Sequence, residues 1–372
     1  MNNSGLAVES DFAFLLSLLP DGWQDKAKEL GALRRCRKIP NAEALLRVLL
    51  IHLAEGCSLR ETALRARSGG IVDLSDVAIM DRLRGAGAWF RWMSAGLMES
   101  WIAGSSRSVF GDQWNVRLID ATRIKEPGPT GSSWTVHYSI GLPSLSCDEL
   151  IVCDKSESGE SFVRFGAQAG DLMVGDRVYG ARRGIFHVTK AGGDVLVRFP
   201  FGNLPLENPD GTRFDLLRRL RALTGRKIGD WPVVLSGEGR SAAGRICAIK
   251  KSRQAAEKAR RHLIRKSQKD GSKPKDETLE ATGYVFVFTT VPRRALCSGK
   301  VLEVYRGRWQ IELVFKRMKS ILGLGHLRKT DKEAAVAWIE GKLFVAFLIE
   351  ALIRCGESFF PWGYPLRESP LH

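Results

Sequence analysis

Residues 115–154 read NVRLIDATRIKEPGPTGSSWTVHYSIGLPSLSCDELIVCD. Three runs in this stretch, NVRLID, WTVHYSI and ELIVCD, are rich in aliphatic and β-branched residues, and segments rich in glycine, proline and serine separate them. Runs of this kind, bounded by turn-forming residues, are typical of β-strands. The stretch therefore predicts that a β-sheet begins shortly after residue 109.

Beyond this stretch the sheet continues and is then interrupted. A strand, a helix and a further strand are predicted in turn at LMVGD (172–176), GARRGIFHVTKAG (180–192) and VLVRFP (195–200). Composition is mixed over 201–282, and YVFVFTT (284–290) predicts a return to a buried strand. Helices are predicted over about 298–322 and 331–354. This order predicts an α/β core that is split by an inserted segment.

The first part of the chain, residues 1–108, lacks strand alternation and has apolar residues at helical spacing, which predicts an all-helical domain. Within it we expect a helix from about 59, a turn at Gly69-Gly70, and a second helix capped by Ser75. This arrangement resembles a DNA-reading helix-turn-helix, but paired short helices are also common in ordinary helical packing. The sequence leaves both interpretations open.

Charge points to a polyanionic partner. The 372-residue chain has a formal net charge of +16 and a pI near 9.7. Residues 250–275 hold eleven Lys or Arg and two acidic residues, so this segment supplies +9 of the excess. Basic surfaces bind nucleic acids by releasing counterions from phosphates. Although basic soluble proteins are common, this concentration of charge favours nucleic acid.

Cysteine and histidine spacing restricts the kind of metal site. The seven cysteines contain no CxxC pair, and no two of the six histidines lie three to five residues apart. These spacings argue against a disulfide framework and a structural zinc site. Any metal ion must then be held mainly by carboxylates, which favour hard ions such as Mg²⁺ or Mn²⁺.

No segment predicts export or membrane insertion. The first residues, MNNSGLAVESDF, lack the basic start of a secretory signal. The longest apolar run near the end, 343–353, is interrupted by Glu350 and is shorter than the roughly 20 residues needed for a membrane span. We therefore expect a cytoplasmic protein.

Two aspartates are candidates for chemistry because of their positions. Asp120 and Asp176 each close a predicted strand, where the backbone is fixed and the following loop is open to substrate. Asp112 and Asp171 are nearby competitors of the same type. Taken singly, each aspartate is also explained as a turn or capping residue.

A second set of candidates lies in YRGRWQIELVFKRMK (305–319). Its polar members are spaced 3, 4 and 7 residues apart and comprise Tyr305, Arg308, Glu312 and Lys319. On one helix these four side chains would fall within an arc of roughly 60°. A carboxylate flanked by two cations and a phenol can hold a metal ion and the phosphates that it polarises. An ordinary solvated face with i,i+4 ion pairing explains the same pattern.

The spacing Tyr-x2-Arg-x3-Glu-x6-Lys resembles the YREK signature of the insertion-sequence-four family of bacterial DDE transposases. The flanking RWQIELVFKRMKSILGLG, the segments LIDATRI, GSSWTVHYSI and GDRVYG, and YVFVFTTVP also resemble that family, so the likeness covers about residues 110–350.

The resemblance implies an α/β fold with an RNase H-like mixed-sheet core, a β-rich insertion and an N-terminal all-helical domain. The expected segments are a DNA-binding domain at 1–108, a first core part at 109–200, the insertion with its basic helical run at 201–282, a second core part at 283–355, and a C-terminal tail at 356–372.

The resemblance also implies roles for single residues. Asp120, Asp176 and Glu312 would form the catalytic and metal-binding triad, holding two Mg²⁺ or Mn²⁺ ions. The phosphate-gripping positions of the family fall on Tyr305, Arg308 and Lys319, and the positions of DNA-stacking aromatics fall near Trp309 and Tyr284.

The expected function is therefore a DNA transposase that cuts element ends and joins them to target DNA. Its expected partners are the terminal inverted repeats, the target DNA and a second copy of the chain in the synaptic complex. Three alternatives stay open at this point. They are a related nuclease that does not join strands, a non-catalytic DNA-binding regulator, and a decayed transposase copy.

Overall fold

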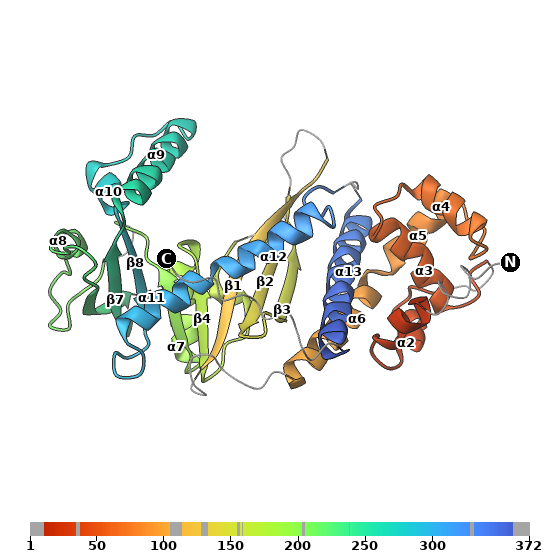
Figure 1. The fold of residues 1–372 in the computed structure, drawn as a ribbon, viewed down its shortest axis with the longest axis horizontal. Coiled ribbons are helices and arrows are strands. Elements are labelled where there is room, and N and C mark those ends of the chain that lie inside the picture. Colours follow the sequence, from red (N-terminus) through yellow and green to blue (C-terminus); the bar gives the residue numbers. More distant parts are fainter. Residues whose placement is uncertain are drawn as a thin grey trace.

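The computed structural model describes residues 11–34, 38–104, 114–127, 133–154, 157, 159–202, 205–237, 239–327 and 331–359. A twisted sheet occupies the middle of the elongated molecule, and the N-terminal helices form one end (Figure 1). The other end is formed by the hairpin of β6 (Gly229–Gly237) and β7 (Arg240–Lys250) together with α8 (Leu216–Arg221). No helix among these residues is long and apolar enough to cross a membrane.

The described residues between 11 and 104 form helices and no strands, as the sequence predicts. After a helical segment at 11–17, the helices are α2 (Trp23–Glu29), α3 (Ala42–Leu53), α4 (Leu59–Ser68), α5 (Asp76–Gly85) and α6 (Gly87–Gly104). The predicted pair of short helices is confirmed. Ser75 caps α5 by accepting a hydrogen bond from the Ala78 backbone N–H at 3.2 Å, and Gly70 turns the chain at φ +66°.

A mixed sheet of eight strands follows, in the order β3-β2-β1-β4-β5-β8-β7-β6. Its strands are β1 (Asn115–Lys125), β2 (Ser133–Leu142), β3 (Cys147–Cys153), β4 (Asp171–Gly175), β5 (Asp194–Arg198), β6 (Gly229–Gly237), β7 (Arg240–Lys250) and β8 (Tyr284–Thr289). The β1–β4 and β4–β5 pairs are parallel, and the remaining pairs are antiparallel. Helix α7 (Arg182–Lys190) makes the crossover from β4 to β5.

The predicted interruption lies between β5 and β8, which pair with each other although about 85 residues separate them. The intervening chain contains β6, β7, α8 (Leu216–Arg221), α9 (Arg253–Lys269) and α10 (Asp276–Ala281). Because β7 pairs with β8, the inserted strands widen the same sheet. Helix α9, which carries the basic run, stands beside this end of the sheet with α10 (Figure 1).

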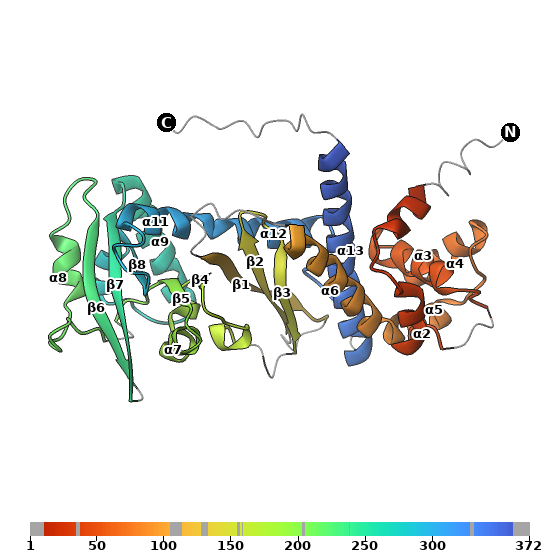
Figure 2. The same ribbon diagram turned by 90° about the horizontal axis from the view of Figure 1, so that it is seen from below.

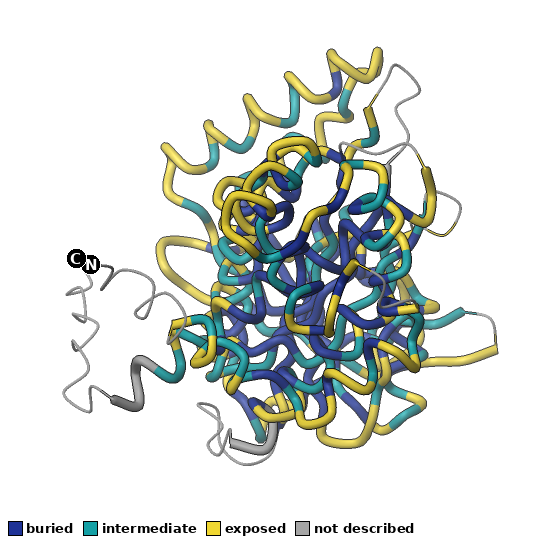
Figure 3. Tube along the Cα trace, turned by 90° about the vertical axis from the view of Figure 1, so that its right-hand side faces the viewer, coloured by how far each residue is buried: buried dark blue, intermediate teal, exposed yellow. Residues whose placement is uncertain are grey.

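Both faces of the central sheet are covered, which explains the continuous apolar runs of β4 and β5. Leu172 and Val174 point toward one core, whereas Met173 points toward the other, where the side chains of α7 pack. Residues close to the middle of the molecule are buried (Figure 3). Along the first of these faces run α11 (Ser298–Gly307) and α12 (Trp309–Ser320), end to end (Figure 2).

The last helix, α13 (Lys332–Phe359), joins the sheet to the N-terminal helices. It packs along α6, with the rings of Phe90 and Phe344 5.5 Å apart and the buried Glu340 paired with Arg91 at 2.7 Å. The helix extends beyond residue 355, where the sequence predicts a tail; residues 360–372 lie outside the described residues. The N-terminal helices therefore share one hydrophobic core with α13.

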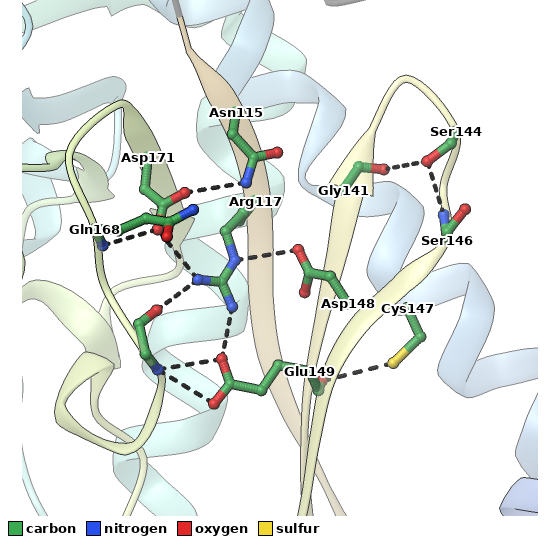
Figure 4. Close-up of polar contacts among 11 residues, drawn as sticks. Asn115, Arg117, Gly141, Ser144, Ser146, Cys147, Asp148, Glu149, Gln168 and Asp171 are labelled. Carbon is green, nitrogen blue, oxygen red and sulfur yellow. Dashed lines mark hydrogen bonds and ion pairs between the residues drawn. The ribbon is translucent and has the colours of Figure 1, made fainter. Parts of the chain in front are cut away.

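A buried arginine fixes the end of the sheet at which β4 begins (Figure 4). The Arg117 guanidinium pairs with Asp148 at 3.1 Å, with Glu149 at 2.7 Å and with Asp171 at 3.3 Å. The Asp171 carboxylate also accepts hydrogen bonds from the Asn115 side chain at 3.0 Å and from the Gln168 backbone N–H at 3.1 Å. These contacts tie β1, β3 and the loop before β4 together.

Candidate active site at the end of strand β4

Sheet register brings Asp120 and Asp176 to the same place. In the parallel pair Leu118 lies opposite Val174, and two residues further along each chain are Asp120 and Asp176. Since side chains alternate along a strand, both aspartates project on the face that α11 and α12 cover. Strand β4 ends at Gly175, so Asp176 follows a strand as predicted.

The prediction that Asp120 ends its strand is wrong. Strand β1 continues to Lys125, because β2 pairs with it along its full length, up to Lys125 opposite Ser133. Asp120 therefore lies inside β1, with strand residues before and after it. The sheet is open beside Asp120 on the β4 side, because β4 is the shorter strand.

The carboxyl group of Asp120 is electrostatically unusual. Its pKa is raised to about 7, first by burial and also by the neighbouring Asp176, although a hydrogen bond from the Ala121 backbone N–H (2.8 Å) and the Arg308 guanidinium oppose the rise. Two carboxylates side by side in a half-buried position favour a bound cation, which would relieve their repulsion. Perturbed groups of this kind cluster at functional sites.

Arg308 links the strand to the helices. It lies at the break between α11 and α12, so the helix predicted over 298–322 is two helices that meet at this residue. Its Nη1 is 3.5 Å from Asp120 Oδ2, and its Nη2 pairs with Glu312. The Arg308 side chain is 16% exposed and that of Glu312 is 57% exposed. The structure thus brings Arg308 of the predicted set to Asp120, and Glu312 is connected to Asp120 through Arg308.

The four polar residues of the predicted stripe face two different recesses. Tyr305 and Arg308 line a groove of about 1030 Å³ together with Asp176. Glu312 and Lys319 line a second recess of about 520 Å³ together with Thr122 of β1. Burial lowers the pKa of Lys319, and the Asp120 carboxylate opposes this effect. The ion pair of Arg308 with Glu312 therefore links the residues that line the two recesses.

The two predicted stacking residues differ in accessibility. Trp309, at the start of α12, is 50% exposed. Tyr284, the first residue of β8, is 8% exposed and belongs to the hydrophobic core on the α7 side of the sheet. A ring buried in this way would have to leave the core before it could stack on a base.

The carboxylates of Asp120, Asp176 and Glu312 are the kind of ligand that a hard divalent cation prefers, although their oxygens do not converge on one point. Among the described residues, no group of three or more His, Cys, Asp or Glu side chains has the geometry of a metal site. Instead, the Arg308 guanidinium supplies the positive charge between Asp120 and Glu312. The Glu312 side chain is 57% exposed, so it can change rotamer toward the two aspartates once its ion pair with Arg308 opens.

Several polar residues near the site carry no motif and escaped the sequence analysis. Glu160 has a raised pKa, caused first by burial and then by Asp176. The hydroxyl of the fully buried Tyr179 has no hydrogen-bond partner among the described residues and lies in the field of Asp120, Glu160 and Asp176. Tyr179 lies in GDRVYG beside Asp176, which was the available signal.

Of the two competing aspartates, Asp171 is accounted for by its contacts. It is completely buried at the opposite end of β4, where it pairs with Arg117. Asp112 lies outside the described residues.

Comparisons with known proteins identify the family to which the chain belongs. A family model described as "Transposase DDE domain" matches residues 156–348, which include Asp176 and Glu312. The chain is 33% identical over 350 residues to the putative transposase InsL for insertion sequence element IS186A of Escherichia coli K12, covering 92% of this chain and 93% of the relative.

Two further relatives carry the same description. The transposase for insertion sequence element IS421 of Escherichia coli is 33% identical over 351 residues, covering 92% of this chain and 93% of the relative. The transposase for IS231F of Bacillus thuringiensis subsp. israelensis is 30% identical over 266 residues, covering 63% and 55%. The chain is a DNA transposase and belongs to the family of insertion-sequence transposases with a DDE domain.

Proposed function

We propose that this transposase cuts the ends of its element and joins them to target DNA, with Asp120, Asp176 and Glu312 as its catalytic carboxylates. The observation that carries the proposal is the pairing of Asp120 and Asp176 on one sheet face, with Arg308 joining Asp120 to Glu312. We further propose that β1–β5 are an RNase H-like core and that the chain belongs to the insertion-sequence-four group with its YREK signature.

DDE transposase domains depend on divalent metal ions. We propose that Asp120, Asp176 and Glu312 would hold two Mg²⁺ or Mn²⁺ ions, which supply an activated attacking oxygen and stabilise the leaving oxygen at phosphorus. Glu312 would have to exchange its Arg308 partner for this role. The guanidinium would then be free to grip a phosphate with two parallel N–H donors.

The remaining residues position the DNA. Tyr305 and Arg308 are placed to contact a phosphate in the groove beside Asp176, and Lys319 reaches the site from the second recess. The exposed Trp309 is better placed than Tyr284 to stack on a base. The α4–α5 helix pair is the candidate reader of the terminal inverted repeats, and synapsis of two ends implies a homodimer acting on nucleoid DNA in the cytoplasm.

The test of this function is incubation of the purified protein with Mg²⁺ and a fragment that carries the native element end. We expect nicks that leave a 3′-OH, followed by joined products when target DNA is added. Nicks without joined products would favour the related nuclease, and binding without nicks would favour the non-catalytic regulator.

Arg308 and Lys319 are expected to act on phosphates more than on folding. Arg308→Lys removes the bidentate grip, and Lys319→Ala removes an exposed cation of the second recess, so each should lower end cleavage at least about tenfold with little change in melting temperature. Cleavage per folded molecule and thermal melting measure the two effects. A large loss of stability with cleavage preserved would show that these residues form a structural charge network.

Arg306→Lys is a suitable control, because Arg306 belongs to α11 but does not line the groove or the second recess. Cleavage by this variant should stay within about twofold of the unaltered protein. If Arg306→Lys and Arg308→Lys lose cleavage equally, then the loss does not depend on the position of Arg308 at the site, and the proposed phosphate grip is wrong.

A further inference from the structure

Helix α9 roofs the groove that contains Asp176, and we call this groove of about 1030 Å³ the α9 groove. Its floor comes from the ends of β4, β5 and β7, and its roof from α9. Its lining includes eight Lys or Arg side chains and one carboxylate, that of Asp176. So uneven a balance of charge calls for a polyanionic occupant.

Three cations gather on the floor of the α9 groove. They are Arg177, next to Asp176, Arg198 at the end of β5, and Lys251 directly after β7. Among the described residues, no carboxylate forms a salt bridge with any of these three cations. The Lys251 ammonium donates one hydrogen bond, to the Thr282 carbonyl oxygen at 2.8 Å.

These three cations line one floor and lie close enough to repel one another. The pKa of Lys251 is lowered to about 8, first by burial and then by Arg198 and Arg177. Like charges are held together in this way where an anion is expected between them, because a phosphate would offset both their repulsion and their desolvation.

An aromatic ring lies in the same groove. Phe201 is half-buried and lines the α9 groove, and its ring meets the Phe286 ring edge-on at a centroid distance of 6.5 Å. Cations that follow a phosphate backbone, combined with aromatic side chains on which bases stack, are the usual features of single-strand binding sites. A duplex presents its bases already stacked and paired, so it offers no free base face to Phe201.

The size of the groove agrees with a single strand. About 1030 Å³ is near the upper end of pockets that hold small molecules, roughly 1000 Å³. A site of this size can hold a few nucleotides of a single strand. The roof cations, which include Lys258, Arg261 and Arg265, lie where the backbone of such a strand would continue.

We propose that the α9 groove binds a single DNA strand, with Arg177, Arg198 and Lys251 holding one of its phosphates and Phe201 stacking on a base. The inference rests on the proposed function, since Asp176 lines the groove and a strand bound there would pass the proposed cleavage site. Its test is independent of cleavage, because binding is measured without divalent metal.

The experiment uses the full chain in EDTA and a fluorescein-labelled oligothymidylate of about ten nucleotides, within the range of known single-strand site sizes. Fluorescence anisotropy gives the affinity at several salt concentrations. The variants are Lys251→Met, Arg198→Gln and Phe201→Ala. Lys227→Met and Arg183→Gln are matched controls, since neither residue is buried and neither lines the groove. Thermal melting checks that each variant is folded.

We expect Lys251→Met and Arg198→Gln each to weaken binding about tenfold and to flatten the slope of log affinity against log salt by about 0.7 for each phosphate that is no longer neutralised. Phe201→Ala should weaken binding about fivefold or more with an unchanged salt slope, and should not affect binding to a duplex of equal length. The two control variants should stay within about twofold.

Equal losses of affinity in Lys251→Met and Lys227→Met would overturn the proposed phosphate site. Equal losses of single-strand and duplex binding in Phe201→Ala would overturn the stacking role and with it the single-strand assignment. If the groove variants bind normally while the unaltered protein still cuts element ends, only this inference fails. If Asp176→Asn still cuts, then the catalytic proposal fails while the binding result stands.

Discussion

Asp120→Asn, Asp176→Asn and Glu312→Gln are each expected to reduce cleavage of the element end by about 10³-fold or more. Each substitution removes a charged oxygen donor from a site that is proposed to hold divalent ions, and groups that act as one unit lose nearly all activity when one is removed. DNA binding should stay within a few-fold, because the cations that contact phosphates are unchanged. Nicking assays and anisotropy on the same preparations measure the two effects.

Asp171→Asn is the matched control for Asp176→Asn, since both residues flank β4. Asp171 pairs with Arg117 at the far end of the strand, so its replacement should lower stability by about 1–3 kcal/mol and leave cleavage per folded molecule intact. Normal cleavage by Asp176→Asn together with loss of cleavage in Asp171→Asn would show that Asp176 is not the second catalytic carboxylate.

Arg117→Met is expected to lower the free energy of unfolding by about 3–5 kcal/mol, because it leaves Asp148, Glu149 and Asp171 together without their shared cation. Denaturant unfolding at neutral pH measures the loss. Burial already raises the pKa of Asp148, and Arg117 opposes this rise. Without the arginine the pKa should rise further, so the loss of stability should shrink as the pH falls toward that raised pKa and grow as the pH rises above it.

The control for this prediction is Arg253→Met. Arg253 also pairs with an acidic residue, Glu257, at 3.2 Å, but its side chain is 94% exposed. Exposed pairs contribute little, so this variant should lose less than about 0.5 kcal/mol. Similar losses of stability in the two variants would mean that burial of the Arg117 cluster has no special effect.

Local patterns in the sequence were sufficient for the strands and most helices, because turn residues and apolar spacing are read over a few residues. They failed at Asp120, where the length of β1 depends on its pairing with β2. They also failed at Arg308, because the helical spacing of apolar residues continues across the point where α11 ends and α12 begins. The first error has a physical reason, because the length of β1 is decided by a partner strand that a local pattern does not show.

The sequence predicted only those residues of the candidate site that belong to a recognisable motif, and the residues it missed have a physical feature in common. Glu160, Arg198 and Lys251 come from a loop and from two strand ends far apart in the sequence. Arg198 and Lys251 are brought together only by the sheet order, in which β8 lies between β5 and β7. A linear sequence with no alignment holds no signal of that proximity.

The position of α13 has a consequence for how the protein is made. Arg91 contacts Glu340 across 249 residues, and Phe90 packs on Phe344. At about 5–20 residues per second, ribosomes need roughly 12–50 s to span that distance. During this time the part of the apolar surface of α6 that α13 covers, which includes Phe90, lacks that partner and is open to non-native contacts. A transcript cut short before residue 332 would yield an aggregation-prone fragment and no partial enzyme.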